Sequence, residues 1–163
     1  MLDTVKDLLA NTKIPAIDAV QMSDLLQYLF STAEKTLRIQ VAEVVYRNDH
    51  VHSNALDVFL ACTLPMAEKA ALSRAHRLFN CPSDWQVELM YDGAVKAMIA
   101  VFQCNYAVRP GTDAFRRYIV RALALELCGL ILCERRTTAF ELSPIPQPLP
   151  AAKDQSETKS SRM

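Results

Sequence analysis

Three carboxylates at helical spacing are the residues of this chain whose types and positions most clearly suggest a chemical role. Asp84, Glu88 and Asp92 recur at every fourth position of a segment with the periodicity of an amphipathic helix. Like charges at this spacing destabilise an isolated helix by about 0.2–0.5 kcal/mol per pair. The helix dipole offsets part of this for the first turn, but Asp92 lies beyond its reach. With Val95 and Ile99 alongside, the face is either a docking surface for a basic partner or a solvated face with two apolar residues.

A basic segment follows the acidic one, although the chain as a whole is neutral. Residues 84–96 carry a net charge of −2, whereas residues 105–136 contain six arginines against three acidic residues, a net of +3. The 18 basic and 18 acidic residues of the chain balance, so a nucleic-acid partner would have to be recognised through this local segregation of charge. The arginines also fit an ordinary solvated helix face.

Catalytic and metal chemistry are not indicated. The groups available for catalysis are His76, Cys81, Glu88 and Asp92, but they form no recognisable nucleophile–base pair, and the chain has no glycine-rich phosphate loop. The five cysteines are scattered among apolar residues with no C-x-x-C pair, and the three histidines complete no metal-ligand spacing. We therefore predict a protein that is not an enzyme, that holds no metal and no cofactor, and whose cysteines are small buried side chains.

The elements that must position these residues are all helical. Only three glycines interrupt a sequence of 163 residues that is 51% hydrophobic, so we predict an all-α, compact helical bundle. Pro15 ends the first helix, Ser23 and Ser83 are predicted N-caps, and Thr112 is predicted to cap the last helix. Pro65 should kink the third helix or divide it in two. The predicted helices cover residues 3–10, 23–47, 53–78, 84–104 and 112–136.

The ends of the chain define the predicted organisation and location. Residues 1–52 form N-terminal helices of unassigned role, residues 53–137 the main helical domain, and residues 138–163 a disordered tail in which prolines alternate from Pro144 to Pro150. No apolar run is long enough to span a membrane, and the first residues lack the pattern of a signal peptide. We therefore expect a cytoplasmic protein with no membrane partner.

The motif Glu88-Leu-Met-Tyr-Asp-Gly93 resembles the acidic-Leu-x-Gln-Glu-Gly signature in region two of bacterial RNA polymerase sigma factors. The family continues as Gly-x-x-x-x-Met-x-Ala-Val-x-x-Phe, and Gly93, Met98, Ala100 and Val101 match this pattern. Upstream, Leu64-Pro65 and the run to Phe79 resemble the family's preceding helix. Downstream, the segment from Phe115 to Arg121 resembles the opening of its promoter-reading helix. The resemblance covers residues 58–133.

This resemblance implies two partners. The acidic helix would dock on the coiled coil of the largest subunit of the RNA polymerase core, with Glu88 and Asp92 at the family's acidic docking positions. The following loop and helix would contact promoter DNA, with arginines on phosphates and Tyr106, Phe115 and Tyr118 available for stacking on unpaired bases. The docking residues implied are Asp84, Glu88, Asp92, Val95 and Ile99. The DNA-binding residues implied are Arg109, Arg116, Arg117, Tyr118 and Arg121.

The chain also departs from the family's pattern. Tyr91 stands where the family has Gln, the only tryptophan is Trp85 on the acidic helix, and no helix-turn-helix domain follows the basic helix. The sequence thus predicts a sigma-factor-like transcription initiation protein that lacks the second DNA-binding domain. The alternative is a helical protein–protein interaction module or regulator that does not bind DNA.

Overall fold

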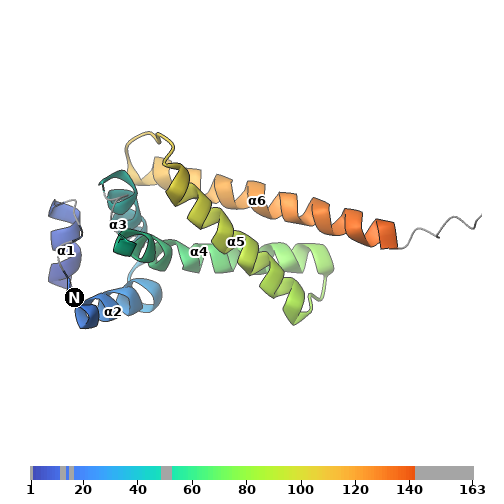
Figure 1. The fold of residues 1–163 in the computed structure, drawn as a ribbon, viewed down its shortest axis with the longest axis horizontal. Helices are drawn as coiled ribbons and strands as arrows, with labels where there is room; N and C mark the ends of the chain where they lie inside the picture. Colours follow the sequence, from blue (N-terminus) through green and yellow to red (C-terminus); the bar gives the residue numbers. More distant parts are fainter. Residues whose placement is uncertain (1, 12–13, 15–16, 49–52, 142–163) are drawn as a thin grey trace, which may run out of the picture.

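The computed structural model describes residues 2–11, 14, 17–48 and 53–141, and within these ranges every regular element is a helix (Figure 1). The predicted all-α class is confirmed. The predicted tail lies almost wholly outside the described residues. The elements are α1 (Leu2–Asn11), α2 (Ala19–Gln27), the π-helix η1 (Tyr28–Thr32), α3 (Lys35–Asn48), α4 (Ser53–Phe79), α5 (Asp84–Cys104) and α6 (Thr112–Glu141).

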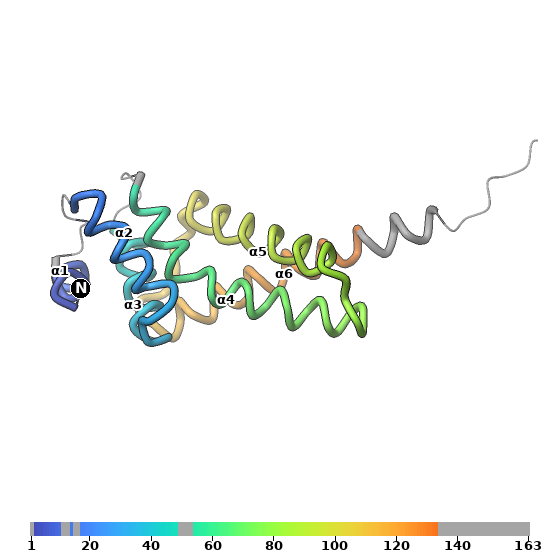
Figure 2. Tube along the Cα trace, turned by 90° about the horizontal axis from the view of Figure 1, so that it is seen from below, coloured from blue at the N-terminus to red at the C-terminus, as the bar shows by residue number. Residues whose placement is uncertain are grey.

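Three long helices, α4, α5 and α6, extend along the long axis of the molecule, and the N-terminal helices gather at one end of it (Figures 1 and 2). At that end α3 packs against α1, α4 and the beginning of α6. Tyr46 of α3 joins these elements, because its ring lies 6.2 Å from that of Phe59 and 5.3 Å from that of Phe115. One buried core runs from Val5 in α1 to Leu127 in α6, so residues 1–52 contribute to the same core as the predicted main domain.

Gly93 lies where α5 packs against Leu130 of α6. A Cβ atom at this position would overlap the side chain of Leu130, which would have to move to make room. Met90, Ala94 and Met98 on the same side of α5 are buried, in agreement with the amphipathic periodicity of this segment.

The second predicted helix, residues 23–47, is wrong in its start and its continuity. The helix begins earlier, at Ala19, and its N-cap is Asp18, whose Oδ1 accepts a hydrogen bond of 2.8 Å from the Gln21 amide. It then widens into η1, where the Ala33 amide donates to the Tyr28 carbonyl over 2.7 Å, and it stops at the extended backbone of Ala33. The Ser31 hydroxyl bonds the Gln27 carbonyl in this turn, a local competition with regular helix bonding that hydrophobic periodicity does not reveal.

The other predicted boundaries agree closely with the structure. Pro65 lies inside α4, which is one helix and not two. The Ser83 amide donates to Gln86 Oε1 over 3.0 Å at the start of α5, and Asn105 ends that helix in the left-handed conformation, with φ of 45°. The first helical bond of α6 runs from the Phe115 amide to the Gly111 carbonyl, so Thr112 is the first residue of the helix and not its predicted cap, and its hydroxyl bonds Glu43 instead. The helix continues to Glu141, beyond the predicted end at residue 136 and into the tail predicted from residue 138.

The cysteines differ from the prediction. Cys62 is buried, whereas Cys81, Cys104, Cys128 and Cys133 are exposed. Cys81 lies in the loop between α4 and α5, and the other three lie on outward faces of α5 and α6. A local apolar composition therefore does not decide the burial of a single side chain. Within the described ranges no group of three or more potential metal ligands is close enough to hold an ion, and no helix is long and apolar enough to cross a membrane.

Candidate functional site

The predicted docking residues form an exposed acidic face on α5. Asp84, Glu88 and Asp92 are exposed, and the ion pairs found among the described residues involve none of them. Val95 and Ile99 are half-buried, so they border this face less prominently than the periodicity predicts. Trp85, which is 55% exposed, adds an aromatic ring at the start of the same helix. These acids and Trp85 are called the acidic face below.

The predicted DNA-binding residues lie on the loop between α5 and α6 and on the first turns of α6. Arg109, Arg116, Arg117 and Arg121 are exposed, as contact with phosphates requires. Tyr118 is half-buried with its ring 6.2 Å from that of Tyr46.

The aromatic residues considered for base stacking have different environments. Phe115 is fully buried and belongs to the core, so it cannot stack on a base. Tyr106 is 64% exposed on the loop that precedes α6. The neighbouring Tyr46 is buried in the core, and this burial, with its hydrogen bond with Tyr118, raises the pKa of its phenol.

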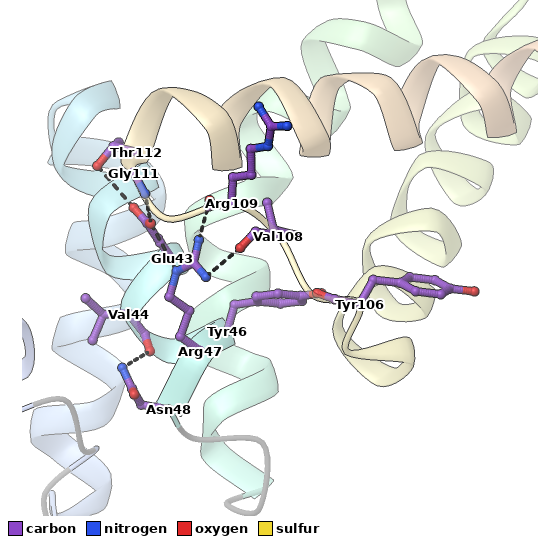
Figure 3. A network of polar contacts seen from close by, with 10 residues as sticks. All are labelled: Glu43, Val44, Tyr46, Arg47, Asn48, Tyr106, Val108, Arg109, Gly111 and Thr112. Atoms are coloured by element: carbon purple, nitrogen blue, oxygen red, sulfur yellow. Dashed lines mark hydrogen bonds and ion pairs between the residues drawn. The ribbon is translucent and has the colours of Figure 1, made fainter.

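A set of hydrogen bonds from α3 holds the loop 105–111 in place (Figure 3). Arg47 donates from Nη1 to the Val108 carbonyl over 2.9 Å and from Nη2 to the Arg109 carbonyl over 2.8 Å. Tyr46 donates its hydroxyl proton to the Tyr106 carbonyl over 2.7 Å. Three carbonyls of this loop, which would otherwise depend on water, are thus bonded to side chains of one helix.

Glu43 completes this set at the start of α6. Its Oε1 accepts the Gly111 amide proton over 3.0 Å and its Oε2 accepts from the Thr112 hydroxyl over 3.1 Å. The same carboxylate pairs with Arg47 at 3.1 Å, and the two side chains are only 13% and 28% exposed. We call Glu43, Tyr46 and Arg47 the latch. Because the latch bonds the residues at which α6 begins, it sets the position of the arginines that follow.

The arginines of α6 form one wall of a groove of about 650 Å³ between α3, α4 and α6. Thr36, Thr112 and Asp113 also line it, and Asp113 is its one acidic residue. The floor is apolar. The cationic residues that line the groove are Lys35, Arg38, Lys69, Arg116, Arg117 and Arg121, and the apolar ones are Ile39, Cys62, Pro65, Met66, Val120 and Ala124.

The structure brings together only part of the predicted DNA-binding set. Arg116, Arg117 and Arg121 share the groove, whereas Arg109 lies with Tyr118 at a separate hollow that Arg117 and Arg121 also border. Lys35, Arg38 and Lys69 were not predicted. They come from two other helices, and no local pattern in the sequence relates them to the arginines.

The acidic face and the basic groove share no residue. The acids Asp84 and Glu88 are at the start of α5, whereas the residues that line the groove come from α3, α4 and α6. The loop that carries Arg109 follows the other end of α5, about 30 Å from Asp84 along the helix axis. In Figure 1 the two ends of α5 lie toward opposite ends of the molecule.

Comparison with known proteins found no match. No family model matches the chain, and no curated protein or solved structure matches it.

Proposed function

We propose that this chain is a sigma-factor-like transcription initiation protein that docks on the RNA polymerase core through the acidic face of α5. The observation that carries the proposal is the exposure of Asp84, Glu88 and Asp92 on one face, without a cation of the described chain paired to any of them. Their mutual repulsion in the free protein would be relieved by cations of a partner. The acidic signature that resembles sigma region two supplies the identity of that partner.

The second part of the proposal is contact with promoter DNA through Arg109, Arg116, Arg117, Tyr118 and Arg121. The exposure of all four arginines supports it, as does the latch, which holds their backbone in place before any partner binds. Guanidinium groups neutralise phosphates without regard to sequence, so this contact would supply affinity and orientation. The half-buried Tyr118 would contribute only its exposed edge.

Co-purification with purified RNA polymerase core tests the docking. We expect the full chain to bind the core, and Glu88→Lys with Asp92→Lys to abolish binding, because both charges on the acidic face are reversed. The matched control is Asp57→Lys with Glu68→Lys, which makes the same change of net charge at two exposed positions of α4. Undiminished binding of the first variant, or equal loss in both, would refute the assignment of this face.

The second candidate function is an interaction module that does not bind DNA. The burial of Phe115 and the half-burial of Tyr118 favour it, because they leave few rings available to stack on bases. A salt titration of binding to a promoter fragment separates the two functions. Promoter contact predicts a DNA affinity that falls steeply with salt, and less steeply in Arg117→Ala with Arg121→Ala. An interaction module predicts no measurable DNA affinity even at low salt.

A further inference from the structure

The groove between α3, α4 and α6 combines a basic rim with an apolar floor. Six cationic side chains from three helices surround it, against the single carboxylate of Asp113. That carboxylate is 4.0 Å from Arg116 in an exposed pair, which neutralises little of the rim. The positively charged rim therefore favours the binding of an anionic ligand.

The apolar floor of the groove places a second requirement on the ligand, in addition to negative charge. Val120 is 50% exposed in the middle of the arginines of α6, and Met66 and Pro65 face the same groove from α4. Below them lies the buried side chain of Cys62, and burial raises the pKa of its thiol. A ligand that covers this floor must carry apolar groups as well as negative charge.

Single-stranded nucleic acid fits the floor poorly. Its bases bind by stacking on aromatic rings, and none of the residues that line the groove in the described part of the chain is aromatic. A helix with acids on one side and aliphatic side chains on the other fits both features, because helix-in-groove recognition places the apolar stripe on the floor and leaves the charges at the rim.

We propose that this groove binds an acidic amphipathic helix of a partner protein. The part of α6 that lines it, from Thr112 to Ala124, is about 18 Å long, which matches roughly three turns of a bound helix. The aliphatic side chains of the partner cover Val120 and Met66, and its carboxylates face the rim. This inference goes beyond the proposed function, and the shared Arg116, Arg117 and Arg121 make the partner helix and DNA mutually exclusive ligands.

The test uses the full chain and a synthetic peptide of about 18 residues, with a leucine stripe on one face and glutamates on the other. The control peptide has the same composition in an order that places no stripe on any helical face. Binding is followed by fluorescence anisotropy. We expect micromolar affinity for the amphipathic peptide and at least about tenfold weaker binding of the control. Equal binding of the two peptides would show a purely electrostatic site and would overturn the proposal.

Val120→Ser distinguishes the contribution of the apolar floor to peptide binding from that of the charged rim. It removes apolar surface without changing charge, and the matched control Leu125→Ser changes a more exposed leucine of α6 outside the groove. We expect a loss of peptide affinity of about fivefold for Val120→Ser and less than about twofold for Leu125→Ser. Circular dichroism confirms that both variants fold. Unchanged peptide affinity in Val120→Ser would refute the proposal.

Lys35→Glu with Lys69→Glu tests the rim from the side opposite α6. Peptide affinity should fall at least about tenfold, whereas Lys6→Glu with Arg77→Glu, at exposed positions outside the groove, should leave it within about twofold. A mixed-sequence single-stranded oligonucleotide is titrated in parallel. If it binds more tightly than the amphipathic peptide and loses affinity in the rim variant, the groove is a nucleic-acid site and the proposal is wrong. No polymerase takes part, so the outcome is independent of the docking proposal.

Discussion

The acidic face and the basic groove are built in opposite ways. The acidic face lies on one capped helix, and its three acids are spaced by the helical repeat alone. The groove draws its six cations from three helices, of which α6 is far from α3 and α4 in the sequence, and the start of α6 is positioned by hydrogen bonds from α3. The first site depends on local structure and the second on tertiary structure. Substitutions in the core or the latch should therefore disturb the groove while the acidic face survives.

The latch shows why the groove depends strongly on tertiary structure. The loop 105–111 is exposed along most of its length. Side chains of α3 bond four of its backbone groups, which are the carbonyls of Tyr106, Val108 and Arg109 and the amide of Gly111. Loops of this kind open at low free energy unless such bonds hold them. The acidic face needs no comparable support, since it is continuous with the buried side of α5.

The largest effect is expected at Phe115, which packs against Tyr46 and Phe59 at the end of the molecule where the groove begins. Phe115→Ala leaves a cavity in this aromatic cluster and should lower the free energy of unfolding by about 3–5 kcal/mol. Tyr106→Ala, at the exposed ring of the adjoining loop, should lower it by less than about 0.5 kcal/mol. Urea denaturation followed by circular dichroism measures both. Similar losses in the two variants would contradict the burial of Phe115.

Glu43→Ala should have the next largest effect, about 2–3 kcal/mol, because it leaves the Gly111 amide, the Thr112 hydroxyl and the Arg47 guanidinium without their acceptor. Hydrogen exchange at the Gly111 amide should accelerate more than exchange at amides in the middle of α5. The control is Glu68→Ala at an exposed position of α4, with a change below about 0.5 kcal/mol. Equal acceleration of exchange at the Gly111 amide and in the middle of α5 would show that the loss of Glu43 destabilises the whole fold and not the loop alone.

The same distinction explains what could be predicted from the sequence. Hydrophobic periodicity and Ser83 located α5, and Thr112 marked the start of α6 to within one residue, because helix faces and helix ends are encoded by neighbouring residues. The positions of the three acids on one face of α5 followed from the same periodicity. The break at Ala33 was missed, since the wide turn before it, in which the Ser31 hydroxyl bonds the Gln27 carbonyl, leaves no mark in the hydrophobic periodicity.

The groove could be predicted only in part. The arginines of α6 were found from their local density, but Lys35, Arg38 and Lys69 join them only once α3 and α4 pack beside α6. Glu43 and Arg47 have the i,i+4 spacing of an ordinary pair on a helix surface, and nothing in the sequence indicates their bonds to a loop some sixty residues away. A single sequence gives no signal for such long-range pairs.

Arg47→Lys tests the latch through a smaller expected loss of stability than Glu43→Ala. Lysine keeps the positive charge beside Glu43 but cannot bond the Val108 and Arg109 carbonyls at the same time as the carboxylate with the fork geometry of arginine. We expect a loss of about 1 kcal/mol in the free energy of unfolding. The matched change is Arg77→Lys, at an exposed position of α4, which should have no measurable effect. A neutral result for Arg47→Lys would mean that its charge, and not its two carbonyl bonds, holds the loop.

The smallest effect concerns the acidic face itself, and its sign is informative. Asp92→Asn removes the repulsion with Glu88 and should raise the free energy of unfolding by about 0.2–0.5 kcal/mol at low salt. Asp84→Asn, in the first turn of the same helix, should lower it by about 0.3–1 kcal/mol because it removes a favourable interaction with the helix dipole. Both changes should shrink at high ionic strength. If Asp92→Asn were destabilising, Asp92 would have a structural role in the free protein, and its exposure could no longer be attributed to a partner. A stability gain combined with weaker binding to the polymerase core would show that the acids of α5 are retained for docking and not for folding.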